Sequence, residues 1–139
     1  MKRFAITLAV VAATLALTAP SAPAKSKFKF FQSPSHNIGC VISGGGVRCD
    51  IRNHQWPTPP KPSTCDVDYG QGVGVGRHDK ASFVCAGDTT LDPTSPALGY
   101  GERIKAKRFR CTSKQKGMRC VNRRNGHGFF LSAQDVRLF

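Results

Sequence analysis

The side chains of this 139-residue chain best suited to acid–base chemistry are four histidines and a few carboxylates. His127 lies between two glycines, which would expose its imidazole as a general acid–base group requires. Glu102, the only glutamate, and Asp88 are the carboxylates that could assist it. With basic side chains holding phosphate, these groups would form a ribonuclease-like site. Glycines also simply make turns before strands, so catalysis at His127 is an alternative hypothesis here.

Basic residues gather in the last third of the chain. Residues 101–139 hold 11 Lys and Arg against two acids, Glu102 and Asp135, a net charge of +9. This density attracts polyanions such as nucleic acid, anionic wall polymers or an anionic membrane surface. The same charge could instead maintain solubility or adhere to an envelope without specificity. The predicted ligand-binding residues are Lys105, Lys107, Arg108, Arg110, Lys114, Lys116, Arg119, Arg123 and Arg124.

Other motifs that could carry chemistry are less specific. No two histidines have helical metal-pair spacing and no Cys-x-x-Cys occurs, so we predict no metal site and no cofactor. The segment 70–76 lacks the Lys-Ser/Thr ending of a phosphate-binding loop and predicts a β segment with close neighbours. Phe109 and Phe129 are expected in the core, whereas Tyr100 and Phe130, if exposed, could stack on bases.

The first 24 residues predict a cleaved secretory signal. Lys2 and Arg3 precede an apolar run from Phe4 to Leu17, and small residues end at Ala24. That run is shorter than the ~20 residues of a membrane-spanning helix, and no later segment could span a membrane. We therefore expect residues 25–139 to form a single secreted domain, extracellular or associated with the cell envelope. Its six cysteines then predict three disulfides.

One disulfide follows from hairpin geometry. If Gly44-Gly45 form a two-residue turn, counting outward places Cys40 opposite Cys49 at a non-hydrogen-bonded site. Cα atoms at such a site lie ~4.5 Å apart, which is within the disulfide range. The sequence therefore predicts Cys40–Cys49.

The same cysteine interval recurs at Cys111 and Cys120. A two-residue turn at Gln115-Lys116 would align them, whereas a bulged turn ending at Gly117 would offset them by one residue. We favour Cys111–Cys120, which leaves Cys65–Cys85, although the sequence alone permits other connectivities. The two matching hairpins fit either a vestigial internal repeat or convergent use of a stapled hairpin.

Short alternating apolar stretches separated by glycine and proline predict an all-β fold, a small antiparallel sheet or barrel-like domain. Over Ile104–Cys111 the alternation shifts phase, which predicts a bulge near Lys107-Arg108. The proline-rich Trp56–Pro62 must be extended. We favour a stiff connector packed across a sheet over an exposed recognition strip.

Several motifs together resemble a known family. They are Phe31–Cys40, Val47–Ile51, Phe83–Thr89, Tyr100-Gly101 and Gly126–Ser132. Their order and spacing resemble a family of small secreted bacterial proteins built around a domain of unknown function. The resemblance implies an exported, disulfide-rich domain, and it implies no activity or catalytic residue.

These observations favour a non-enzymatic, secreted binding or envelope-associated protein whose basic C-terminal face engages an anionic polymer. One alternative is a small ribonuclease-type hydrolase that uses His127. Another is an inhibitor of an enzyme that presents a loop such as Trp56–Pro62. The sequence identifies no protein partner.

Overall fold

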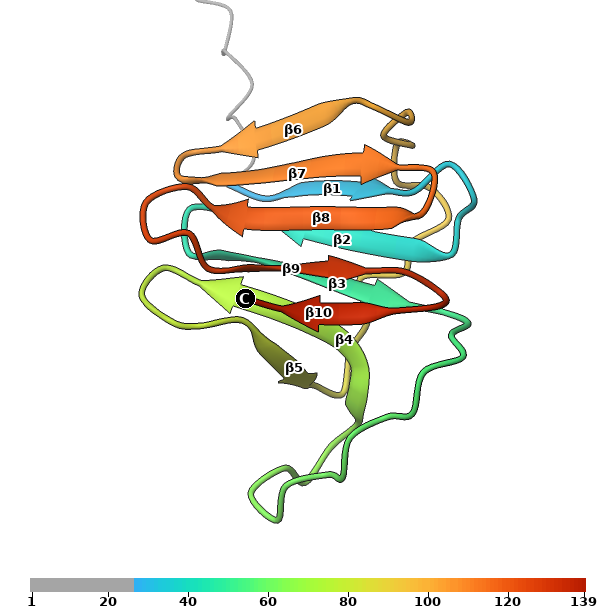
Figure 1. Ribbon diagram of the computed structural model, residues 1–139, viewed down its shortest axis with the longest axis vertical. Helices are drawn as coiled ribbons and strands as arrows, with labels where there is room; N and C mark the ends of the chain where they lie inside the picture. The colour runs from blue at the N-terminus through green and yellow to red at the C-terminus, as the bar shows by residue number, and fades with distance from the viewer. Residues whose placement is uncertain (1–26) are drawn as a thin grey trace, which may run out of the picture.

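Each half of the chain forms one antiparallel sheet, and the two sheets lie face to face (Figure 1). The structure is a computed structural model that describes residues 27–139; the predicted signal peptide, residues 1–24, lies outside the described residues. Within them the chain is all-β and has no helix. Sheet A contains β1 Lys29–Gln32, β2 Ile38–Ile42, β3 Gly46–Ile51, β4 Tyr69–Gly76 and β5 Ser82–Cys85. Sheet B contains β6 Arg103–Ala106, β7 Phe109–Lys114, β8 Gly117–Asn122, β9 Gly128–Leu131 and β10 Val136–Leu138.

The β2–β3 hairpin has the predicted register. The Ser43 N–H donates to the Gly46 carbonyl over 2.9 Å and closes the two-glycine turn. Cys40 lies directly opposite Cys49, with Cα atoms 4.1 Å apart, and the two form a disulfide. The prediction of Cys40–Cys49 is confirmed.

The β7–β8 hairpin also joins its cysteines directly. Lys114 pairs with Gly117, so Gln115-Lys116 form a two-residue turn, and the offset considered for Gly117 does not occur. The Cys111–Cys120 disulfide spans Cα atoms 4.1 Å apart, and the Cys65–Cys85 disulfide spans 5.9 Å. All three predicted disulfides are confirmed.

The predicted bulge near Lys107-Arg108 is wrong, because these two residues are a hairpin turn. Ala106 pairs with Phe109, and Lys107 adopts a φ of 51°, an uncommon conformation for a residue other than glycine. The apolar alternation shifts phase there because the chain reverses. Across the turn Ile104 lies opposite Cys111, so both face the other sheet.

The core lies between the sheets and has two disulfides at its centre. Phe31, Phe109 and Phe129 are almost completely buried, which confirms the core placement expected for the last two. Cys49 Sγ lies 3.8 Å from Cys120 Sγ, so the two stapled hairpins touch through equivalent residues. These hairpins lie at the same position in each sheet, because each joins the second and third strands.

The two sheets are related by an approximate two-fold axis. Both run in the same order from top to bottom of Figure 1, and corresponding strands such as β2 and β7 point in opposite directions. The interpretation of the matching cysteine hairpins as an internal repeat fits this arrangement, because the likeness extends beyond the hairpins to both five-strand meanders.

Residues 86–98, here called the strap, cross the outer face of sheet A from β5 to β1. The Gln32 N–H donates to the Pro96 carbonyl, and the Leu98 N–H donates to the Gln32 carbonyl. The Thr90 hydroxyl donates to the Gly39 carbonyl over 2.6 Å. A Cβ at Gly39 would collide with the Thr90 carbonyl, so glycine lets the strap lie against the sheet.

Asp50 is buried beneath the strap and is fully hydrogen-bonded. Its carboxylate accepts two hydrogen bonds from Arg48, at 2.9 and 2.7 Å, one from the Thr89 hydroxyl and one from the Thr90 N–H. Arg48 also pairs with Asp88 at 2.7 Å. A Cβ at Gly72 would occupy the space of the Asp50 carboxylate, which accounts for one glycine of the segment 70–76.

The proline-rich segment is anchored at its first residue. The Trp56 side chain belongs to the core, and its indole N–H donates to the Ser132 carbonyl over 2.9 Å. The His54 ring stacks on it with centroids 3.6 Å apart. Packing is thus observed at Trp56, which is therefore not part of an exposed recognition strip. The expectation that the whole segment packs across a sheet is not met, because Pro57, Thr58 and residues 60–62 are exposed on the loop that projects from the sandwich between β3 and β4 (Figure 1).

Candidate anion-binding face

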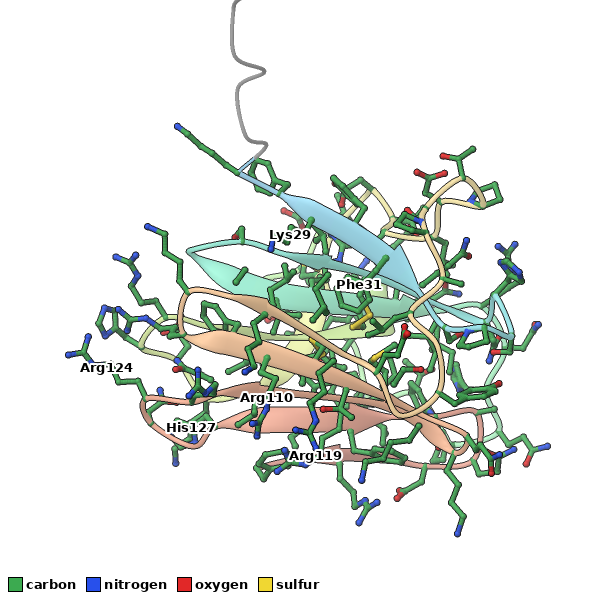
Figure 2. The ribbon with its side chains drawn as sticks, turned by 90° about the horizontal axis from the view of Figure 1, so that it is seen from above. Lys29, Phe31, Arg110, Arg119, Arg124 and His127 are labelled. Atoms are coloured by element: carbon green, nitrogen blue, oxygen red, sulfur yellow. A yellow bond between two sulfur atoms is a disulfide. The ribbon has the colours of Figure 1, made fainter. Side chains whose placement is uncertain are left out.

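The outer surface of sheet B carries basic side chains on successive strands. On β7 the buried residues Phe109 and Cys111 alternate with Arg110 and Lys114, which therefore face outward. The same alternation turns Arg119 of β8 outward. Figure 2 shows Arg110 and Arg119 along sheet B, whereas Phe31 lies between the sheets.

Strand register aligns these side chains into a row across the sheet. Arg103 lies opposite Thr112, which lies opposite Arg119; Arg119 in turn lies opposite Phe130. Phe130 lies opposite Arg137, so the row crosses all five strands. We call the surface built on this row the cationic face. Its members are Arg103, Lys105, Arg110, Lys114, Lys116, Arg119, Phe130, Arg137 and Phe139.

A groove of about 620 Å³ lies on this face, lined by Lys114, Gln115, Lys116, Arg119, Phe130, Arg137 and Phe139. The Arg119 guanidinium lies 4.8 Å from the Phe139 ring centroid, and that of Arg137 lies 4.8 Å from the Phe130 centroid. An arginine stacked on a ring can still donate from the edge of its guanidinium to anions, although the Nε–H of Arg137 is already engaged by Asp135. Tyr100, half-exposed, lines a smaller neighbouring cavity of about 230 Å³ with Lys114 and Lys116.

Little negative charge compensates this face. Among residues 27–139, the ion pairs engage only two basic side chains, Arg48 on sheet A and Arg137, whose Nε lies 2.8 Å from Asp135. The other basic groups of the cationic face lie outside these ion pairs. The face therefore carries a net positive charge that would attract an anionic ligand.

The nine predicted basic residues divide between two places. Lys105, Arg110, Lys114, Lys116 and Arg119 belong to the cationic face. The remaining four lie in turns at one end of the sandwich: Lys107 and Arg108 between β6 and β7, Arg123 and Arg124 between β8 and β9.

The structure does not bring the predicted catalytic residues together. His127 lies level with Asn122 on β8, and Glu102 lies level with Ser113 on β7. Asn122 pairs with Phe109, which lies four residues from Ser113 on β7. His127 and Glu102 are therefore separated by about 13 Å along the strand direction alone. Asp88 belongs to the strap on the opposite sheet, where it pairs with Arg48.

The described residues hold neither a cluster of metal ligands nor a membrane-spanning helix. Within residues 27–139, no group of three or more His, Cys, Asp or Glu side chains could hold a metal ion. The same part of the chain contains no helix of the length and hydropathy needed to cross a membrane.

Comparison with known families places the chain. The sequence model of the family of unknown function DUF6636 matches residues 9–139. The chain belongs to this family. The resemblance to a family built around a domain of unknown function is thereby confirmed. No curated protein and no solved structure matches the chain.

Sequence reasoning missed several members of the site. Arg103 and Arg137 were counted in the basic segment but not singled out, and Phe139 was overlooked. The alternation of Arg119 between Met118 and Cys120 was a usable signal for its outward direction. The placement of Arg103 and Phe130 in one row with Arg119 required the strand register, which no local pattern supplies.

Proposed function

We propose that the protein is an exported, non-enzymatic binding module that engages an anionic polymer through the cationic face. The observation that carries the proposal is the row of basic and aromatic side chains across sheet B, with almost no carboxylate partner. Guanidinium and ammonium groups would contact successive anionic groups of the polymer, and the exposed rings would pack against its sugars or bases.

Export is supported by two independent features. The first residues have the pattern of a secretory signal, and three disulfides are typical of proteins that fold in an oxidising compartment. The polymer would then be a wall polymer or a nucleic acid outside the cytoplasm, or the protein would adhere to an anionic membrane surface.

The test measures fluorescence anisotropy of a labelled oligouridylate across a salt series. The triple variant R103Q/R110Q/R119Q should bind at least tenfold more weakly. The slope of log affinity against log salt should flatten by about 2, because each lost phosphate contact removes ~0.7. A matched triple variant, R52Q/K61Q/K80Q, removes the same charge from exposed positions outside the face and should change affinity far less.

Equal losses of affinity in the two triple variants would show that binding depends only on net charge, and this result would overturn the proposal. The RNA recovered after each titration is also run on a denaturing gel. Cleavage by the wild-type protein that is lost in H127A would favour the hydrolase alternative instead.

A further inference from the structure

Three arginines from three different loops converge at one end of the sandwich. Arg77 follows β4, Arg108 lies in the β6–β7 turn, and Arg124 lies in the β8–β9 turn. Sheet A supplies the first and sheet B the other two. Figure 2 shows Arg124 with His127 at this end, apart from Arg110 and Arg119.

One buried side chain ties two of these loops together. Asn122 is completely buried, and its Nδ2 donates to the Gly76 carbonyl at 3.2 Å and the Arg77 carbonyl at 3.0 Å. Its Oδ1 accepts a hydrogen bond from the Arg124 N–H at 3.1 Å. Both ends of one amide therefore fix the backbone positions of Arg77 and Arg124.

The third arginine is tied to the same loops. The Arg108 carbonyl accepts from the Arg123 N–H at 2.8 Å, and the Arg108 guanidinium reaches the Arg77 carbonyl at 3.5 Å. The backbone of all three arginines is thus held in place before any ligand arrives, which lowers the entropic cost of binding.

Arg108 lies close enough to Arg77 and Arg124 for their positive charges to repel its own. Desolvation, followed by the charges of Arg77 and Arg124, lowers the pKa of the Arg108 guanidinium. No ion pair among the described residues engages any of the three. Asp79 is the acidic residue nearest to Arg77 in the sequence. Its carboxylate lies against Gly76 and lines a hollow on the outer face of sheet A. An anion would relieve this repulsion.

We propose that Arg77, Arg108 and Arg124 form a separate binding site for a doubly charged phosphate group. Guanidinium groups donate paired hydrogen bonds to phosphate oxygens, and three of them supply enough donors and charge for a dianion. The group is either free inorganic phosphate or a phosphomonoester at the end of a polymer. The site shares no residue with the cationic face, so it stands independently of the function proposed above.

The experiment titrates inorganic phosphate into the oxidised protein at constant ionic strength and follows the arginine Nε–H signals by NMR. Phosphate should shift the signals of the three arginines. Single variants R77Q, R108Q and R124Q should each weaken binding about tenfold, the loss expected for one charge-assisted contact. Circular dichroism should show unchanged folding.

Two variants serve as matched controls. R123Q removes the same charge from the residue beside Arg124 and should weaken phosphate binding less than twofold. The cationic-face triple variant R103Q/R110Q/R119Q should also bind phosphate normally, which separates failure of this site from failure of the proposed function.

Two oligonucleotides, one with a 5′-phosphate and one with a 5′-hydroxyl, distinguish the sources of the group. A preference for the phosphorylated end that R108Q abolishes identifies a polymer end as the ligand; arginine-dependent phosphate binding without that preference identifies the free anion. Absence of a phosphate-dependent shift, or an R123Q loss as large as that of R124Q, would overturn the site.

Discussion

Asp50 and Asp88 share the guanidinium of Arg48 but differ completely in exposure. Asp50 is buried beneath the strap, whereas the Asp88 side chain is 83% exposed. The hydrogen bond from Arg48, followed by its charge, lowers the pKa of the Asp88 carboxyl. One arginine thus joins β3 to the start of the strap through both carboxylates.

Asp88 should make stability depend on pH in the acid range. Because its pKa is lower in the folded than in the unfolded chain, its contribution is fully present above the unfolded value, ~3.9, and is lost as pH falls through the folded value. D88N should therefore be less stable than wild type at pH 7, and the difference in unfolding free energy should shrink as the pH falls below ~3.9. Urea denaturation at a series of pH values measures it.

The matched control is D66N, at an exposed aspartate outside the ion pairs among residues 27–139. The difference in unfolding free energy between D66N and wild type should not shrink at low pH as that of D88N does. A D88N difference that stayed constant from pH 7 to pH 2 would contradict the role assigned to the carboxylate.

At the scale of elements, the strap depends on close approach to β2. A Cβ at Gly39 would meet the backbone of both Thr90 and Leu91, the Leu91 Cα at 2.9 Å. Thr90 cannot easily retreat, because its N–H and hydroxyl are bound to Asp50 and Gly39. The contact is backbone against backbone, so no flexible side chain can absorb a larger residue.

G39A should therefore destabilise the protein by about 2 kcal/mol, the usual cost of overpacking. The control G45A lies at the tip of the β2–β3 hairpin, where the nearest atom to a new Cβ is the Ser43 Oγ at 3.7 Å. Its effect should stay within about 0.5 kcal/mol. Equal shifts of the urea midpoint in the two variants would show that the strap tolerates displacement from the sheet.

Local elements could be predicted from the sequence, whereas long-range ones could not. The register of the β2–β3 hairpin could be predicted because two glycines mark the turn, and pairing residues outward from Gly44-Gly45 gives every partner. The turn at Lys107-Arg108 was missed because it contains no glycine or asparagine and Lys107 adopts a positive φ. The strap could not be foreseen, since Gly39 and Thr90 meet only in the folded sheet.

The candidate site also combines features that are local in the sequence with features that arise only when the two sheets pack. The basic segment could be predicted to form one surface region because sheet B consists of consecutive strands. The division of its residues between the cationic face and the loop end depends on register and turn position. Arg77 belongs to the other half of the chain, and only the packing of the two sheets brings it beside Arg108.

The disulfides offer a test of what stabilises the sandwich. Loop entropy alone would make Cys65–Cys85 the more stabilising bond. Its sequence separation of 20 corresponds to ~3.3 kcal/mol, whereas the separation of 9 in Cys40–Cys49 corresponds to ~2.6 kcal/mol. Packing favours the opposite order, because Cys40–Cys49 is wholly buried against Cys120, whereas Cys85 is exposed.

We expect packing to dominate, so that C40A/C49A loses more stability than C65A/C85A in urea denaturation, since it leaves a cavity at the centre of the core. A larger loss in C65A/C85A would show that restriction of the unfolded chain outweighs the packing of the sulfur atoms.

The order of the cysteines in the three disulfides has a consequence for biosynthesis. The first cysteine pairs with the second, the third with the fourth, and the fifth with the sixth. In the export proposed above, each bond could therefore close as soon as its second cysteine emerges from a translocation channel, and no bond would have to wait for the other sheet. An oxidase acting on the emerging chain would produce the native pairs in sequence. We therefore expect maturation to depend on thiol oxidation but not on a disulfide isomerase.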